Sequence, residues 1–230
     1  MNDAPTSGHP RRGFLARLLA ATGAIAAAGL APGALRGETA TSPETRRTGH
    51  DHDRWLDALK GEHRQIFDVP AHGNGRPLNQ VRNFLNAYRD DYGVPDEKVN
   101  VVVGIHGGAV PMVFRDEAWA KFGLGDRNGI VDPRTRAPAT RNIFLGGEQG
   151  DAVDTGASIL ALQKRGAVFL LCNNSLKRVT GTLAAAGFGT PEAVRAELLD
   201  LLLPGVTVVP AMVVAMNRAQ ARGFTYVYAG

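Results

Sequence analysis

The chain is poor in cysteine, since Cys172 is the only one in 230 residues. A single thiol cannot form an internal disulfide, so the fold depends on core packing. The net charge is also small, because 26 lysines and arginines are balanced by 22 acidic residues. The first 40 residues hold four of the arginines and two of the acids, which leaves a net charge of about +2 on the rest. We therefore expect no nucleic-acid partner.

Phosphate-binding motifs are missing as well. Neither the glycine fingerprint of dinucleotide-binding proteins nor the Walker pattern occurs. A flavodoxin-type protein that binds a small molecule or cofactor is thus the least supported function, and we expect no cofactor. His50, Asp51 and His52 resemble metal ligands, but no further ligand is spaced to complete a site. We expect no metal.

Residues 1–40 have the pattern of a twin-arginine signal peptide. Arg11 and Arg12 are followed by Phe14 and Leu15, and then by an apolar run built mostly from Ala, Gly and Leu. The run is too diluted for a typical Sec signal and is interrupted by glycines and a proline, which disfavours a retained anchor. We expect a folded protein that engages the twin-arginine translocon and is exported to the periplasm.

Residues 41–60 are predicted to be a solvated linker, with Trp55, Leu56 and Leu59 docking its end onto the domain. Residues 61–230 alternate strand and helix patterns. Buried or short strands are predicted at 63–69, 99–105, 167–172, 206–209 and 224–228, and helices between them, including 154–166, 175–186, 191–203 and 210–222. This order predicts a three-layer α/β fold, with a five-stranded, mainly parallel sheet and helices on both faces, as in flavodoxin-like proteins.

Cys172 ends a predicted buried strand and precedes a predicted helix. Five apolar residues, 167–171, lead to the thiol, and a helix is predicted to begin near Asn174. Ligands and chemistry collect beyond the carboxyl ends of parallel strands, and a helix N-terminus favours a thiolate. Asn173 and Asn174 are therefore candidate binding residues beside a candidate catalytic Cys172. The alternative is that Cys172 is a small buried apolar residue.

Two further segments contain candidate binding residues. His106, Gly107 and Gly108 follow a buried strand, so they either approach a ligand at the sheet edge or only form a tight turn. The long polar stretch 123–150 is typical of a lid, a binding loop or an oligomer contact. Its Arg134, Arg136 and Arg141 either bind an anion or form a solvated face, and no acidic partner is evident from the sequence.

Three segments in order resemble the DsrE/DsrF-like family: Leu162-Gln-Lys-Arg-Gly166, Val168-Phe-Leu-Leu-Cys-Asn-Asn-Ser-Leu176, and the stretch from Leu203-Pro-Gly205 to Gly223-Phe-Thr-Tyr-Val-Tyr228. The resemblance implies a homo-oligomer, trimer or hexamer, and a redox or sulfur-metabolism partner protein. Some members carry persulfide sulfur on a cysteine in the position of Cys172. We expect an exported, oligomeric accessory or binding protein without catalysis; the alternative is a persulfide carrier or sulfur relay that uses Cys172.

Overall fold

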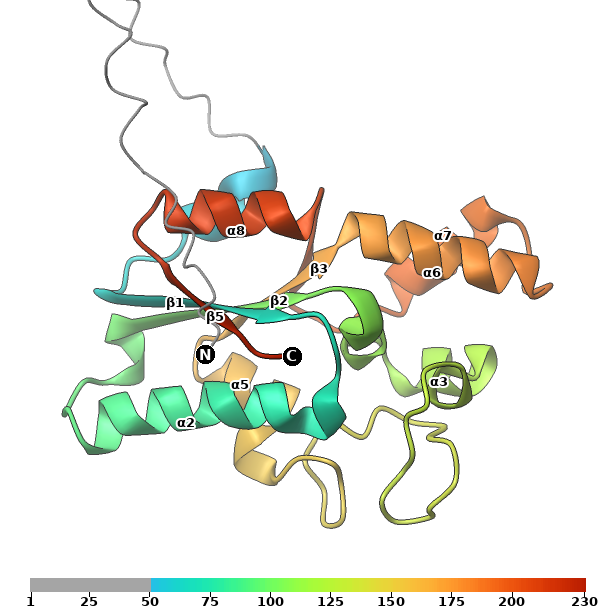
Figure 1. Ribbon diagram of the computed structural model, residues 1–230, viewed down its shortest axis with the longest axis horizontal. Coiled ribbons are helices and arrows are strands. Elements are labelled where there is room, and N and C mark those ends of the chain that lie inside the picture. The colour runs from blue at the N-terminus through green and yellow to red at the C-terminus, as the bar shows by residue number, and fades with distance from the viewer. Residues whose placement is uncertain (1–50) are drawn as a thin grey trace, which may run out of the picture. The chain divides into compact units, whose positions relative to one another are not determined.

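Five parallel strands form the sheet on which the described part of the chain, residues 51–230, is built (Figure 1). The structure is a computed structural model. The strands are β1 (His63–Val69), β2 (Val99–Ile105), β3 (Val168–Cys172), β4 (Val206–Val209) and β5 (Thr225–Tyr228), in the spatial order β4-β3-β2-β1-β5. The predicted signal peptide, residues 1–40, and His50 lie outside the described residues.

The length and burial of each strand depend on whether it lies inside the sheet or at its edge. β1, β2 and β3 are the interior strands, and their apolar runs are covered on both sides, as the sequence predicted. β4 and β5 are edge strands and are shorter, and every residue of β5 is exposed. All four strand pairings are parallel, so the α/β prediction is confirmed. Every strand therefore ends at the same edge of the sheet.

Helices cover both faces of the sheet (Figure 1). One face packs against α1 (Arg54–Asp57) and α8 (Met212–Gln220), through Trp55, Leu56 and Met216 among others. The opposite face holds the larger core, which includes Phe169, and the remaining helices contribute buried side chains to this core. These are α2 (Arg76–Asp90), α3 (Asp116–Phe122), α4 (Leu124–Arg127), α5 (Ile159–Lys164), α6 (Asn173–Ala185) and α7 (Pro191–Asp200), with 3-10 turns η2 (Gly73–Gly75), η3 (Asp96–Lys98), η4 (Gly107–Val113) and η5 (Thr155–Ala157) between them.

The folded domain includes residues before 61, which is the start predicted from the sequence. Trp55 and Leu56 are buried in the core beneath α8, and η1 (Asp51–Asp53) precedes them. Residues 51–60 therefore belong to the folded domain, although they were predicted as the end of a linker. The predicted docking of Trp55 and Leu56 onto the domain is confirmed.

Two predicted helices have different limits in the structure. The helix expected from Asp154 is divided, because Asp154 caps η5 and Ser158 caps α5 through hydrogen bonds from the N–H groups of Ala157 and Ala161. The helix expected to run to Leu203 ends at Asp200. Leu203 leaves it because its N–H donates to the carbonyl of Val113, at 2.9 Å. In both cases a local or tertiary hydrogen bond overrides the helical pattern.

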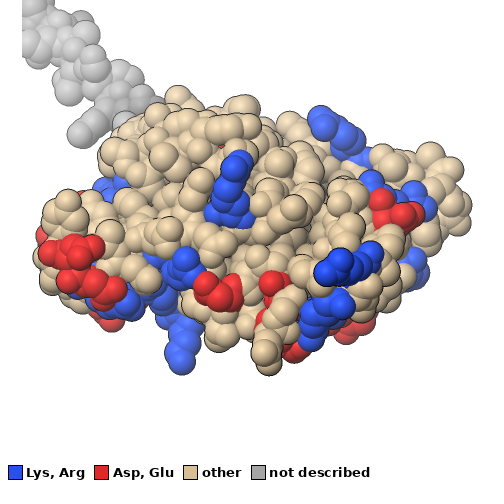
Figure 2. All heavy atoms as spheres, turned by 60° about the horizontal axis from the view of Figure 1, so that its bottom comes forward, with Lys and Arg blue, Asp and Glu red and all other residues tan. Residues whose placement is uncertain are grey.

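The surface charge of the described residues is mixed. Figure 2 shows acidic and basic side chains interspersed on the face it presents. Several of them form ion pairs, such as Lys121 with Glu197 and Arg165 with Asp96. Within residues 51–230, no helix is both long enough and apolar enough to cross a membrane.

Replacing either of two glycines with alanine adds the same methyl group, but we expect opposite effects on the free energy of unfolding. Gly181 lies inside α6 with open space around it, so Gly181→Ala should raise the free energy of unfolding by about 0.5–1 kcal/mol, since alanine loses less backbone entropy. Gly125 is buried, and a Cβ there would overlap the backbone of Ala139. Gly125→Ala should lower that free energy by about 1–3 kcal/mol. Denaturant titration measures both; equal effects of the two substitutions would contradict this packing.

Candidate functional site

The carboxyl edge of the sheet brings the candidate residues of three strands onto one face. Ile66 of β1, Val102 of β2 and Leu170 of β3 all lie in the core beneath α8. Side chains alternate along a strand, so the residues two positions further, Asp68, Gly104 and Cys172, point to this same face. A Cβ on Gly104 would lie 2.7 Å from the sulfur of Met212 in α8, which agrees with this orientation.

Cys172 ends β3 and is the N-cap of α6. Its side chain lies under α8, and the residue is 6% exposed. The backbone N–H of Met212, the first residue of α8, donates to the sulfur at 3.4 Å. The first turns of two helices, α6 and α8, therefore meet at one thiol, as sequence analysis predicted for the first of them.

The surroundings of Cys172 favour its ionised form. Burial raises the pKa of the thiol, but hydrogen-bond donors to the sulfur outweigh burial and hold the pKa below its ordinary value of 9.0. These donors are the backbone N–H groups of Ser175, Met212 and Asn174 and the hydroxyl of Ser175. Hydrogen bonds to the charged form and the helix dipole both stabilise a thiolate. Cys172 is thus a buried thiol whose hydrogen-bond donors favour the thiolate.

A second group of side chains lies at the same edge: Asp68, His106 and Tyr226. Nε2 of His106 is 2.6 Å from Oδ1 of Asp68, and the hydroxyl of Tyr226 donates to Oδ2 of Asp68 at 2.7 Å. Asp68 is buried, so these two donors satisfy its carboxylate. His106 follows β2 directly, and Tyr226 belongs to β5, the neighbour of β1. Nδ1 of His106 has no hydrogen-bond partner within residues 51–230.

Ser175 joins the two groups. Its hydroxyl oxygen accepts from the N–H of Gly107, at 3.1 Å, while the hydroxyl interacts with the sulfur of Cys172. Gly107 has a φ of +56°, and a Cβ there would lie 2.6 Å from the carbonyl oxygen of Pro70. The turn after β2 therefore needs glycine at 107, and it also directs an N–H toward Ser175. The tight turn expected from the sequence is therefore present.

The two asparagines after Cys172 have different positions. The Oδ1 of Asn173 accepts from Nη2 of Arg195 in α7, at 2.7 Å. Asn174 is exposed and contributes its backbone N–H near the sulfur. Gly108 donates its N–H to the carbonyl of Pro70 at 2.8 Å, which closes the turn beside His106.

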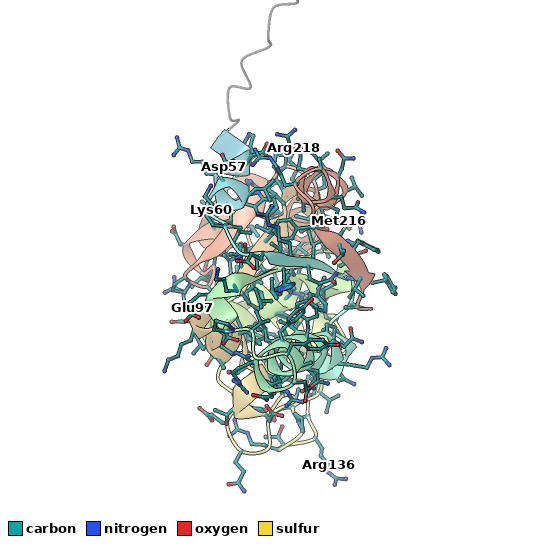
Figure 3. All side chains as sticks on the ribbon, turned by 90° about the vertical axis from the view of Figure 1, so that its left-hand side faces the viewer. Asp57, Lys60, Glu97, Arg136, Met216 and Arg218 are labelled. Atoms are coloured by element: carbon teal, nitrogen blue, oxygen red, sulfur yellow. The ribbon has the colours of Figure 1, made fainter. Side chains whose placement is uncertain are left out.

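The hydrogen bonds and ion pairs of Arg134 and Arg141 do not reach the candidate residues of this edge. Arg136 lies at the opposite end of the molecule from Met216 and Arg218 of α8 and points outward (Figure 3). Arg141 binds the carboxylates of Asp151, at 2.6 Å, and Asp132, at 3.1 Å. The expectation that these arginines have no acidic partner was wrong for Arg141 and also for Arg134, which pairs with Glu148 at 3.2 Å. The ion pairs hold the loop closed on itself instead of leaving cations free.

The sequence alone does not single out Asp68, Tyr226 or Arg195. Asp68 and Tyr226 are 158 residues apart and meet only because β5 pairs with β1. The one local signal is an aspartate between apolar residues near the end of a predicted strand, where a buried carboxylate needs donors. Within the described residues, no group of three or more His, Cys, Asp or Glu side chains is arranged to hold a metal ion.

The hydrogen bond to Asp68 predicts an unusual titration of Tyr226. It raises the pKa of Tyr226 from 10.0 to about 12, because the phenol donates its proton to a carboxylate and the phenolate would face that charge. The bond is thus retained below pH 10 and is lost only as the pH rises through about 12. In Asp68→Asn the pKa should fall back toward 10. Ultraviolet titration of tyrosinate, with Tyr226→Phe as the control, measures it; an unchanged profile in Asp68→Asn would contradict the contact.

No protein-family model matches this chain, and no curated protein matches it in sequence. Among solved structures, the chain is similar to MTH1491, a protein of unknown function from Methanobacterium thermoautotrophicum. The two share 20% sequence identity with a TM-score of 0.38, over 73% of this chain and 99% of that one. A similarity of this degree indicates nothing about function.

Proposed function

We propose that this chain is a sulfur carrier in which the Cys172 thiolate accepts a sulfane sulfur and passes it on. The observation that supports the proposal is the convergence of the α6 and α8 N-termini on the sulfur of Cys172, with a donor N–H from Met212 at 3.4 Å. A thiolate, not a thiol, is the nucleophile in such chemistry. The low exposure of Cys172 protects a bound sulfane sulfur from other thiols in solution.

The proposed loading step is a thiolate exchange without net redox change. The Cys172 thiolate attacks the outer sulfur of a donor persulfide, R–S–SH. A new S–S bond forms at Cys172, the S–S bond of the donor breaks, and R–S⁻ leaves with the electron pair. The products are Cys172–S–SH and a thiolate, and the reverse reaction delivers the sulfur to an acceptor thiolate.

His106 is our candidate for the base that takes the proton of the Cys172 thiol before the thiolate attacks. Asp68 binds Nε2 of His106, so this nitrogen carries the proton in the neutral ring and Nδ1 is left as an acceptor. Nδ1 can accept that proton, and the protonated ring can then give it to the leaving thiolate R–S⁻. Asp68 and Tyr226 are positioning residues in this scheme, since they contact the imidazole or its carboxylate partner.

We extend the proposal to export, family membership and assembly, which were inferred from the sequence. The twin-arginine leader implies that the carrier folds before export and acts in the periplasm. Membership in the DsrE/DsrF-like family is supported by a thiol that ends an interior strand of a five-stranded parallel sheet, as that resemblance implies. A homo-oligomer and a sulfur-metabolism partner protein belong to the same proposal.

A second candidate function is an oligomeric accessory protein without catalysis. Exposed apolar side chains on α8 and β5 favour it, notably Val213 at 73% and Tyr228 at 63% exposure. Isolated domains rarely expose such residues together, and protein interfaces are enriched in them. This candidate needs no reactive Cys172, so the chemistry of the thiol distinguishes the two functions.

Mass spectrometry of the exported protein after treatment with a low-molecular-weight persulfide tests the carrier function. We expect a gain of about 32 Da on the wild type, reversed by mild reduction and absent from Cys172→Ser. Ser175→Ala should load more slowly, because it removes the hydroxyl beside the sulfur. A Cys172 that remains unmodified, and that also resists alkylation until the protein is denatured, would exclude the carrier and leave the accessory function.

A further inference from the structure

Arg195 of α7 has an unusual set of contacts for an arginine. It is half-buried, and its Nη2 donates to Oδ1 of Asn173 at 2.7 Å. Its Nη1 is buried and has no hydrogen-bond partner within residues 51–230. No carboxylate of these residues forms an ion pair with it, whereas Arg141, Arg165 and Arg218 each bind one. This guanidinium therefore has no anionic partner among the described residues, unlike those three arginines.

Arg195 lines a cavity beside Cys172. The cavity has a volume of about 300 Å³ and is lined by His52, Asn173, Arg195, Val208, Val209 and Pro210. Asn173 follows Cys172 in the chain, and Val209 of β4 is the register partner of Cys172 across the sheet. Two direct neighbours of Cys172, one along the chain and one across the sheet, thus line this cavity.

The remaining walls are mostly apolar and extend the space. Val208, Val209 and Pro210 form one side. A second cavity of about 330 Å³ shares His52, Val209 and Pro210 with the first and continues toward Trp55 of α1. A volume of about 300 Å³ holds on the order of ten water molecules, which is much more than a small inorganic ion requires. One cation and an apolar wall suit an organic anion.

We propose that Arg195 binds the carboxylate of a small organic persulfide, the donor that loads Cys172. The guanidinium lines the cavity without a carboxylate partner, its planar fork matches a carboxylate, and Asn173 fixes the plane of the fork. The apolar part of the donor packs against Val208, Val209 and Pro210. The identity of the donor rests on the proposed sulfur-carrier function, but the anion site itself does not.

Binding without sulfur transfer tests the site first. N-acetylcysteine and its methyl ester are titrated into the Cys172→Ser protein by NMR. The free acid should bind about tenfold more tightly than the ester, and Arg195→Gln should abolish this difference. Arg195→Lys should keep part of it, which shows that a folded cationic variant still binds. Lys177→Gln is the matched control, because Lys177 is exposed on α6 and lines neither cavity.

Sulfur transfer to Cys172 then tests the chemical class of the donor. N-acetylcysteine persulfide should load Cys172 about tenfold faster than its methyl ester, with the preference lost in Arg195→Gln and kept in Lys177→Gln. If acid and ester bind alike, or if Arg195→Gln lowers both rates equally, the anion site is overturned. If binding depends on Arg195 while Cys172 takes up no sulfur, the anion site stands and the carrier function falls.

Discussion

Parallel pairing of all five strands is the constraint on which the rest of this structure depends. It brings every strand end to one edge, and the helix that follows each strand must begin there. α6 begins at the end of β3, and α8 begins shortly after β4, the strand beside it. Their first N–H groups therefore meet at Cys172, and the same edge collects Asp68 and His106 from β1 and β2. An antiparallel sheet of the same residues would separate these groups between two edges.

Two effects act on Cys172 in opposite directions, and their balance decides its chemistry. Burial alone disfavours a thiolate and would make the residue an inert part of the core. Donors from Ser175, Met212 and Asn174 favour the thiolate, and they prevail. The hydrogen-bonded Asp68–His106–Tyr226 group lies at the same edge, and Arg195 lines a cavity next to it without a carboxylate partner among residues 51–230. We propose the roles of nucleophile, proton carrier and anion-binding residue for Cys172, His106 and Arg195.

The sequence predicted what depends on local pattern. The limits of β2 and β4 follow from mainly apolar runs, and the position of Cys172 before a helix follows from the asparagines and serine after it. It did not predict contacts that depend on strand order, such as Asp68 with Tyr226 or Asn173 with Arg195. The ion pairs of Arg141 were missed because Asp132 and Asp151 approach it only when the loop folds back on itself.

The measurement that most directly tests this account is the ultraviolet absorbance of the Cys172 thiolate as a function of pH, with Cys172→Ser subtracted. Because Cys172 is the only cysteine, the difference belongs to one group. We expect the midpoint of this titration below pH 9.0, since the N–H donors of α6 and α8 outweigh burial. A midpoint at or above 9.0 would mean that burial prevails, and Cys172 would then be a core residue.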